Sequence, residues 1–235
     1  MTPLLDDKYA PITSEIGFLE CSLEHITKAF EEWQTPIQIA RENRLARRVV
    51  EGNLETKLLA LVPLTSHEAR RYLFVPTRGQ WTAFFDNGWR GTDAFSTVSE
   101  LCIRAKCRGL RCVFVPHSES GRAGRSRGTV FELYMPDASG CSFLNIRRSV
   151  SCVFDNSWAF DAAGEPPLPF ERLDQYKNRL VKNRFTPEML TDYLRHFGVE
   201  FLQQSFYEGG GAYLIEKTGP CAAGTKEYSI REARS

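Results

Sequence analysis

Side chains capable of acid–base chemistry stand beside turns at several separate points of the sequence. They are three aspartates, one histidine and one arginine: Asp86, Asp93, His117, Arg148 and Asp155. Carboxylates and imidazoles move protons, and an arginine holds an anionic group, so loops that gathered these five would build the site of a hydrolase or transferase. This enzymatic hypothesis predicts one concave pocket in which at least one of the side chains has a perturbed pKa.

Two of these aspartates belong to a recurring stretch of five residues. "FDNGW" occupies residues 85–89 and "FDNSW" occupies residues 154–158, so the copies begin 69 residues apart (154 minus 85). Asp and Asn accept left-handed backbone and hydrogen-bond to their own main chain, which suits a tight turn after a strand. Because the residues around the copies do not align further, we interpret both as turn scaffold rather than as a paired catalytic or cation-binding site.

Motifs for metal and nucleotide binding fail on spacing. Cys102, Cys107 and Cys112 are five residues apart, not in the CxxC arrangement that closes on zinc, and they lie in apolar surroundings. The glycines within residues 121–128 do not form GxGxxG and precede a strand rather than a helix. We therefore predict no metal site and no cofactor.

Aromatic side chains and a basic loop form the alternative functional surface. The residues predicted to build it are three tryptophans and three arginines of a glycine-rich loop: Trp81, Trp89, Trp158, Arg122, Arg125 and Arg127. Tryptophan and arginine are residue types that anchor protein–protein interfaces. Although arginines also suit an RNA backbone, the formal net charge of +1 and the lack of aromatic residues within the loop disfavour nucleic acid.

The lack of a catalytic motif favours binding over catalysis. We predict a non-enzymatic module that binds another protein, for example a toxin-neutralising or accessory protein. Self-association through open strand edges or the aromatic turns is the other expected mode. The seven cysteines suit reduced thiols, and no apolar window or leader pattern points to a membrane, so we expect a cytoplasmic, bacterial-type protein without a membrane partner.

The order of the expected elements indicates an α+β fold with a mixed, largely antiparallel sheet and about five helices. Helices are predicted over residues 22–33, 37–52, 94–107, 170–181 and 186–197, with Pro36 ending the first. Strands are predicted over residues 56–63, 71–76, 80–85, 110–116, 129–135 and 144–154, followed by a hairpin of 199–207 with 212–217.

Arg148 breaks the alternation of the last long strand, because it falls on the apolar face. A buried guanidinium needs a carboxylate, and we expect Asp86, Asp155 or Asp161 to provide it.

We expect a single compact domain over residues 1–217. The proline-rich residues 165–169 would join possible sub-lobes at 1–164 and 170–217, and residues 218–235 would form a flexible tail.

Overall fold

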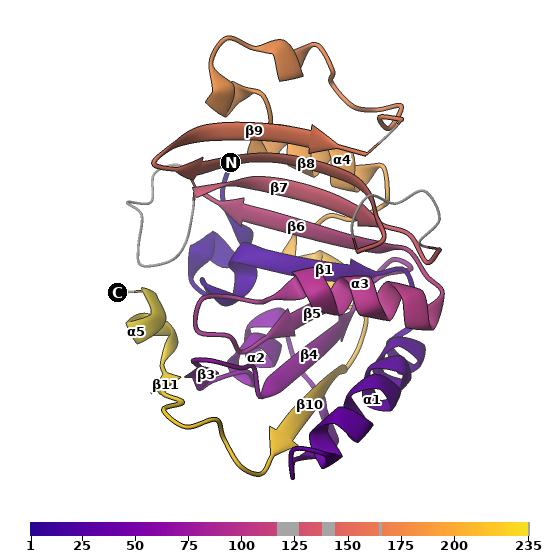
Figure 1. Cartoon of the computed structure of the whole chain (residues 1–235), viewed down its shortest axis with the longest axis vertical. Helices are drawn as coiled ribbons and strands as arrows, with labels where there is room; N and C mark the ends of the chain where they lie inside the picture. Colours follow the sequence, from indigo (N-terminus) through magenta and orange to yellow (C-terminus); the bar gives the residue numbers. More distant parts are fainter. Residues whose placement is uncertain (117–126, 138–143, 165, 235) are drawn as a thin grey trace.

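Nine antiparallel strands form the central sheet of the computed structural model, which describes residues 1–116, 127–137, 144–164 and 166–234. The strands are β1 Glu15–Leu19, β2 Arg44–Val50, β4 Arg71–Pro76, β5 Thr82–Asp86, β6 Gly109–Val115, β7 Arg127–Tyr134, β8 Ile146–Asp155, β9 Ser157–Ala163 and β10 Ala212–Thr218. Their spatial order is β2-β10-β4-β5-β1-β6-β7-β8-β9. Figure 1 labels this order from β10 to β9. A second, two-stranded sheet pairs β3 Leu64–Thr65 with β11 Glu227–Tyr228.

Helices cover both faces of the large sheet. The described residues form α1 Leu23–Ile39, α2 Leu54–Leu59, α3 Ala94–Ala105, α4 Pro187–Arg195 and α5 Ile230–Arg234. α1 and α3 lie on one face, while α2 and α4 lie on the other (Figure 1). The fold is thus α+β and compact, with a large antiparallel sheet, which confirms the predicted class.

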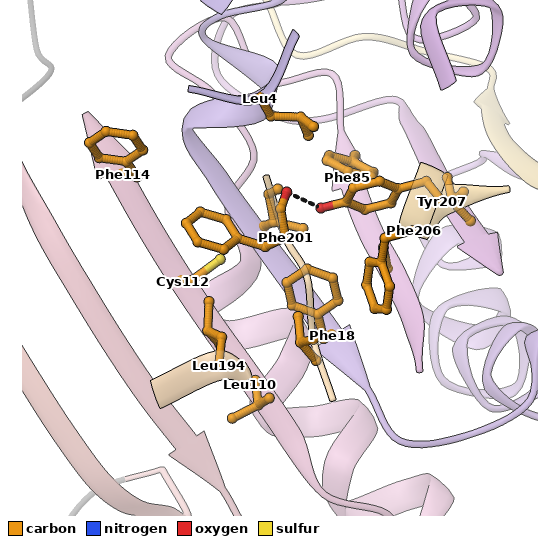
Figure 2. Close-up of a cluster of buried hydrophobic side chains, with 14 of the residues drawn as sticks. Leu4, Phe18, Phe85, Leu110, Cys112, Phe114, Leu194, Phe201, Phe206 and Tyr207 are labelled. Carbon is orange, nitrogen blue, oxygen red and sulfur yellow. Dashed lines mark hydrogen bonds between the residues drawn. The ribbon is translucent and has the colours of Figure 1, made fainter. Parts of the chain in front are cut away.

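Strand alternation divides the core into two layers. In β5, Phe84 packs under α1 and α3, whereas its neighbour Phe85 packs on the α4 side. Figure 2 shows the α4-side layer, in which Phe18 and Phe85 of the sheet meet Phe201 and Tyr207 from the chain after α4. The fully buried Tyr207 hydroxyl donates a hydrogen bond to the Phe201 carbonyl oxygen at 2.8 Å. The Tyr207 hydroxyl is therefore satisfied within the layer.

α3 approaches the sheet closely because two strands offer glycine beneath it. A Cβ atom placed at Gly17 of β1 would lie 2.6 Å from Val98 Cγ2, and one at Gly109 of β6 would lie 2.6 Å from Val98 Cγ1. A side chain at either position would therefore force Val98 to shift. The close contact sets the height of α3 above the sheet, and with it the position of the amino end of this helix.

The strongest departure from the sequence prediction is the segment after α1. The helix runs through Pro36, which lies exposed in its last turn, where only one intrahelical hydrogen bond is lost. Residues 44–50, predicted as part of a helix over 37–52, instead form β2 and pair residue by residue with β10. The apolar spacing fits both structures, and pairing with a distant strand decides between them.

Three further elements differ from the prediction. Residues 56–63 were expected to form a strand, but Asn53 caps α2 there by accepting a hydrogen bond from Thr56 N at 2.9 Å. Within the expected helix over 170–181, the structure has only short 3-10 turns. Residues 199–207 form no strand, so β10 pairs with β2 and β4 rather than in the predicted hairpin.

The carboxyl-terminal segment also has more structure than a flexible tail would. After β10 the chain returns to the body of the protein, where β11 pairs with β3 and α5 follows (Figure 1). The core likewise extends across residues 165–169, since Val150 and Tyr193 belong to the same cluster of buried side chains.

Candidate binding cleft

Three of the residues selected from the sequence meet in one cleft. Asp86, Trp89 and Asp93 line a hollow of about 770 Å³ where β5 ends and α3 begins. Its other walls come from α1, from the segment 65–72 that leads into β4, and from the carboxyl-terminal residues 224–228. The cleft therefore joins parts of the chain that are far apart in sequence.

Asp86 forms the floor of the cleft. Its side chain is buried, with Oδ1 accepting a hydrogen bond from Gly88 N at 2.8 Å and Oδ2 accepting one from Asp93 N at 3.0 Å. The pKa of Asp86 is raised to about 7, mainly by burial and to a smaller extent by the nearby carboxylates of Asp93 and Glu15. The two N–H donors act in the opposite direction, because they favour the charged form. Near neutral pH this carboxyl group exists in both protonation states.

Asn87, the next residue of "FDNGW", fixes the backbone around the cleft. The side-chain oxygen accepts hydrogen bonds from Arg70 N at 2.7 Å and Arg71 N at 2.9 Å, and Nδ2 donates to the Pro63 carbonyl oxygen at 2.8 Å. The side chain is buried. This copy of the motif is thus a buried clamp on the start of β4.

The second copy has a different structure. Asp155 pairs with Ser157 across the β8–β9 turn, where the exposed Asn156 takes a φ of 59°. β1, β6 and β7 separate β5 from β8, so Asp155 stands four strands from Asp86, roughly 19 Å at about 4.8 Å per strand. The two aspartates are therefore not placed to act as an acid–base pair or to share a cation.

A stacked pair of aromatic rings forms one wall. The rings of Trp89 and Tyr228 lie 5.2 Å apart at an interplanar angle of 21°, and the Arg90 guanidinium lies 5.0 Å from the Trp89 ring centre. Trp89 N donates to the Thr65 carbonyl oxygen at 3.1 Å, which ties this wall to the small sheet. Tyr228 is a cleft residue that the sequence prediction missed, because it lies in the segment interpreted as a tail.

Comparison with protein-family models, with curated proteins and with solved structures finds no match. Any function of the cleft must therefore be inferred from its own residues.

A polar rim faces the aromatic wall. Ser66 Oγ lies 2.9 Å from Nδ1 of the exposed His67 and accepts a hydrogen bond from Lys226 N at 2.9 Å. His67 has a φ of 69°, a left-handed conformation that is uncommon outside glycine. Glu68 bonds to the buried Lys217 Nζ at 2.7 Å, so its charge is already balanced. The sequence contains all of these residues, but no motif distinguishes them.

α1 provides the third wall. Phe30 contacts Trp33 with ring centres 5.9 Å apart and Tyr72 with ring centres 4.9 Å apart, and the Tyr72 hydroxyl donates to the Ala69 carbonyl oxygen at 2.8 Å. The cleft therefore combines aromatic surface with carboxyl, hydroxyl and imidazole groups. In the described part of the chain, no three His, Cys, Asp or Glu side chains are grouped to hold a metal ion.

Arg148 lies away from the cleft and has a different partner from those predicted. Its side chain is buried on the α4 face, where Glu171 binds it, with Nε donating to one carboxylate oxygen at 2.7 Å. Asp86 faces the α1–α3 side of the sheet. Asp155 lies an odd number of residues from Arg148 on β8, and Asp161 pairs with Ser151, so both also lie on the face opposite to Arg148. A shift of one residue in a strand reverses the face, so none of the three aspartates reaches Arg148.

The predicted binding residues are also dispersed. Trp81 is not a surface residue, because it is 3% exposed and donates from Nε1 to the Phe197 carbonyl oxygen at 2.8 Å. Trp158 is half-buried and packs edge-on against Phe154 on β8, and the Arg127 guanidinium lies 4.6 Å from the Phe154 ring centre. Trp89 is thus the only one of the three tryptophans that lines the Asp86 cleft.

The remaining predicted residues, His117, Arg122 and Arg125, lie outside the described residues. Within the described ranges, no helix has the length and apolar character needed to cross a membrane.

Proposed function

We propose that the protein is a non-enzymatic module that binds another protein through the cleft around Asp86 and Trp89. A toxin-neutralising or accessory role belongs to this class. The observation that carries the proposal is the stacked Trp89–Tyr228 wall standing beside a buried carboxyl group in a concave site. Aromatic side chains in such recesses are the usual centres of binding energy in protein interfaces.

The charges of the cleft are mixed rather than predominantly basic. Its lining holds Glu68, Asp86 and Asp93 beside Arg90 and Lys226, with Glu68 already paired to Lys217 and Asp86 partly protonated near neutral pH. A phosphate backbone is bound by an excess of cations, whereas a protein segment presents amides and side chains of both signs, so this lining suits a polypeptide.

A bait experiment with matched variants tests the proposal. Four purified proteins would be immobilised as baits: wild type, the cleft variants Trp89→Ala and Asp93→Lys, and the control Trp158→Ala. The control removes a half-buried tryptophan far from the cleft. We expect wild type and Trp158→Ala to retain a stoichiometric partner. Both cleft variants should bind this partner with an affinity at least about tenfold weaker, the loss typical of an anchoring residue. Circular dichroism would verify that each variant is folded. The proposal fails if no partner is retained, or if a partner binds the cleft variants as well as wild type.

One observation supports an enzyme as a second candidate. Asp86, with a pKa near 7, can act as a proton donor or acceptor at neutral pH, and the Ser66–His67 pair stands in the same cleft. A hydrolase or transferase of this kind would not use Arg148 or Asp155, which lie elsewhere. A panel of ester and phosphoester substrates tests this enzymatic candidate. Asp86→Asn must abolish any turnover found. Asp93→Lys, which should lose the protein partner, would show whether turnover and partner binding depend on the same residues.

A further inference from the structure

β2 is an outer strand of the large sheet, and its second side is open. All seven of its residues, Arg44 to Val50, pair with β10 on one side, and in the described part of the chain no strand pairs with the other side. Peptide groups alternate between the two sides of a strand, so every second residue of β2 directs its N–H and C=O outward. Five of the seven residues are also exposed. Such an edge is a template for another strand.

The two faces of β2 carry charge differently. On the face toward α1, Arg47 is already engaged, with NH1 3.1 Å from Glu24 Oε1 and its guanidinium 4.8 Å from the Tyr213 ring centre. On the opposite face, Arg44 and Arg48 are exposed, and neither forms an ion pair with a described carboxylate. β2 therefore presents two uncompensated positive charges four residues apart.

We propose that β2 binds an acidic, extended segment of another protein as a tenth strand of the sheet. The incoming strand would complete the open backbone hydrogen bonds. Two carboxylates, four residues apart, would lie opposite Arg44 and Arg48, because cross-strand neighbours of opposite charge stabilise a pair. Its other face would place apolar side chains beside Val49, which is 53% exposed.

A second copy of this chain is a poorer occupant of the β2 edge, because it would bring the same two positive charges. An antiparallel, two-fold pairing of β2 with itself centred on Ala46 places Arg44 of one copy opposite Arg48 of the other. Like charges directly opposite each other destabilise a strand pair. In this register the edge thus discriminates against self-pairing while remaining open to an acidic strand. This surface is separate from the Asp86 cleft, and its test does not depend on the cleft.

A peptide titration tests the proposal directly. The probe is a fluorescein-labelled nine-residue peptide with valine at even positions, glutamate at the third and seventh positions and threonine elsewhere. Two control peptides carry lysine in place of glutamate, or N-methyl groups on alternate backbone nitrogens. Fluorescence anisotropy would give the affinities, and amide shifts of ¹⁵N-labelled protein would locate the site.

The proposal predicts binding of the acidic peptide with shifts confined to β2 and β10. We expect at least tenfold weaker binding of the lysine peptide and no binding of the N-methylated peptide. Arg48→Glu should abolish the preference between the two charged peptides, because each peptide then faces one charge of its own sign and one of the opposite sign. Arg44→Glu combined with Arg48→Glu should reverse the preference, whereas Arg179→Glu, at an exposed arginine outside the sheet, should leave it unchanged. Absence of binding, equal binding of the N-methylated peptide, or a dimer by light scattering whose interface the amide signals place on β2 would each overturn the proposal.

Discussion

Arg148 and Glu171 form an ion pair that is closed off from solvent, with side chains 3% and 0% exposed. Arg148 Nε and NH2 donate to the two Glu171 carboxylate oxygens at 2.7 and 2.5 Å, and Tyr176 OH donates to the same carboxylate at 2.9 Å. Burial alone would raise the pKa of Glu171, but the hydrogen bonds from Arg148, Leu168 N and Tyr176 lower it. The pair fastens the segment after β9 onto β8.

Removing one member of this pair should cost more than removing both. Arg148→Met leaves the Glu171 carboxylate buried without its cation, and we expect the free energy of unfolding to fall by about 3–5 kcal/mol. Arg148→Met combined with Glu171→Leu should recover part of this loss, because no unpaired charge remains. Urea denaturation measures both values.

The exposed pair between Arg172 and Asp192 provides the comparison. Arg172→Ala should lower the free energy of unfolding by no more than about 1 kcal/mol, the usual range for a surface ion pair. Equal costs for Arg148→Met and Arg172→Ala would contradict the closed environment of the first pair.

The contact between Gly17 and Val98 should make alanine costly at position 17. Its Cβ would stand 2.6 Å from Val98 Cγ2, and we expect Gly17→Ala to destabilise the protein by about 1–3 kcal/mol through overpacking. In a Val98→Ala background the same substitution should cost less, because the opposing methyl group is gone. Gly79→Ala is the control, since its Cβ would have no heavy atom nearer than 3.8 Å. Thermal denaturation of the five proteins tests this, and an unchanged cost in the Val98→Ala background would disprove the clash.

Local patterns in the sequence predicted five consecutive strands of the large sheet but missed β9, although it pairs with its chain neighbour β8. The predicted strands at 71–76, 80–85, 110–116, 129–135 and 144–154 correspond to β4 to β8, and the glycine and capping signals found α3 and α4. The helix predicted in place of β2 was wrong, because Leu45 and Val49 also fit helical spacing and only pairing with the distant β10 reveals the strand. Local propensity contains no information about a partner that far along the chain.

The cleft shows the same limit. Asp86 and Trp89 attracted attention as polar and aromatic residues at a turn, and the structure places them together. Their association with His67 and Tyr228 depends on the pairing of β3 with β11, two strands of two residues each. Strands this short carry no periodic signal. The burial of Arg148 was predictable from alternation, whereas the identity of Glu171 as its partner was not, since it lies in a segment without regular structure.

Asp86 should make stability decrease as pH rises through the weakly acidic range. Its pKa is about 7 in the folded protein and about 3.9 in an unfolded chain, so between these values the native state binds more protons. The contribution of Asp86 is therefore fully present below about pH 4 and is lost as pH rises toward 7. Carboxyl ¹³C NMR of wild type, assigned with Asp86→Asn, should show a titration near 7.

Unfolding measurements provide a second check on Asp86. The free energy of unfolding of wild type relative to Asp86→Asn should fall between pH 5 and 7.5. An Asp86 resonance that titrates near pH 4 would mean that the N–H groups of Gly88 and Asp93 outweigh burial.

The two copies of the aspartate–asparagine turn should respond differently to the loss of asparagine. Asn87→Ala removes the acceptor of Arg70 N and Arg71 N and the donor to Pro63 O from a buried side chain whose three hydrogen bonds are partly buried, and we expect a loss of at least about 2 kcal/mol. Asn156→Gly retains the left-handed backbone of an exposed turn, where φ is 59°, and should change stability by no more than about 0.5 kcal/mol. Chemical denaturation of both variants measures the contrast. Similar costs would show that the copies have a shared structural role, whereas a large difference would establish that only the first is a buried clamp, because its asparagine satisfies three backbone groups through one buried side chain.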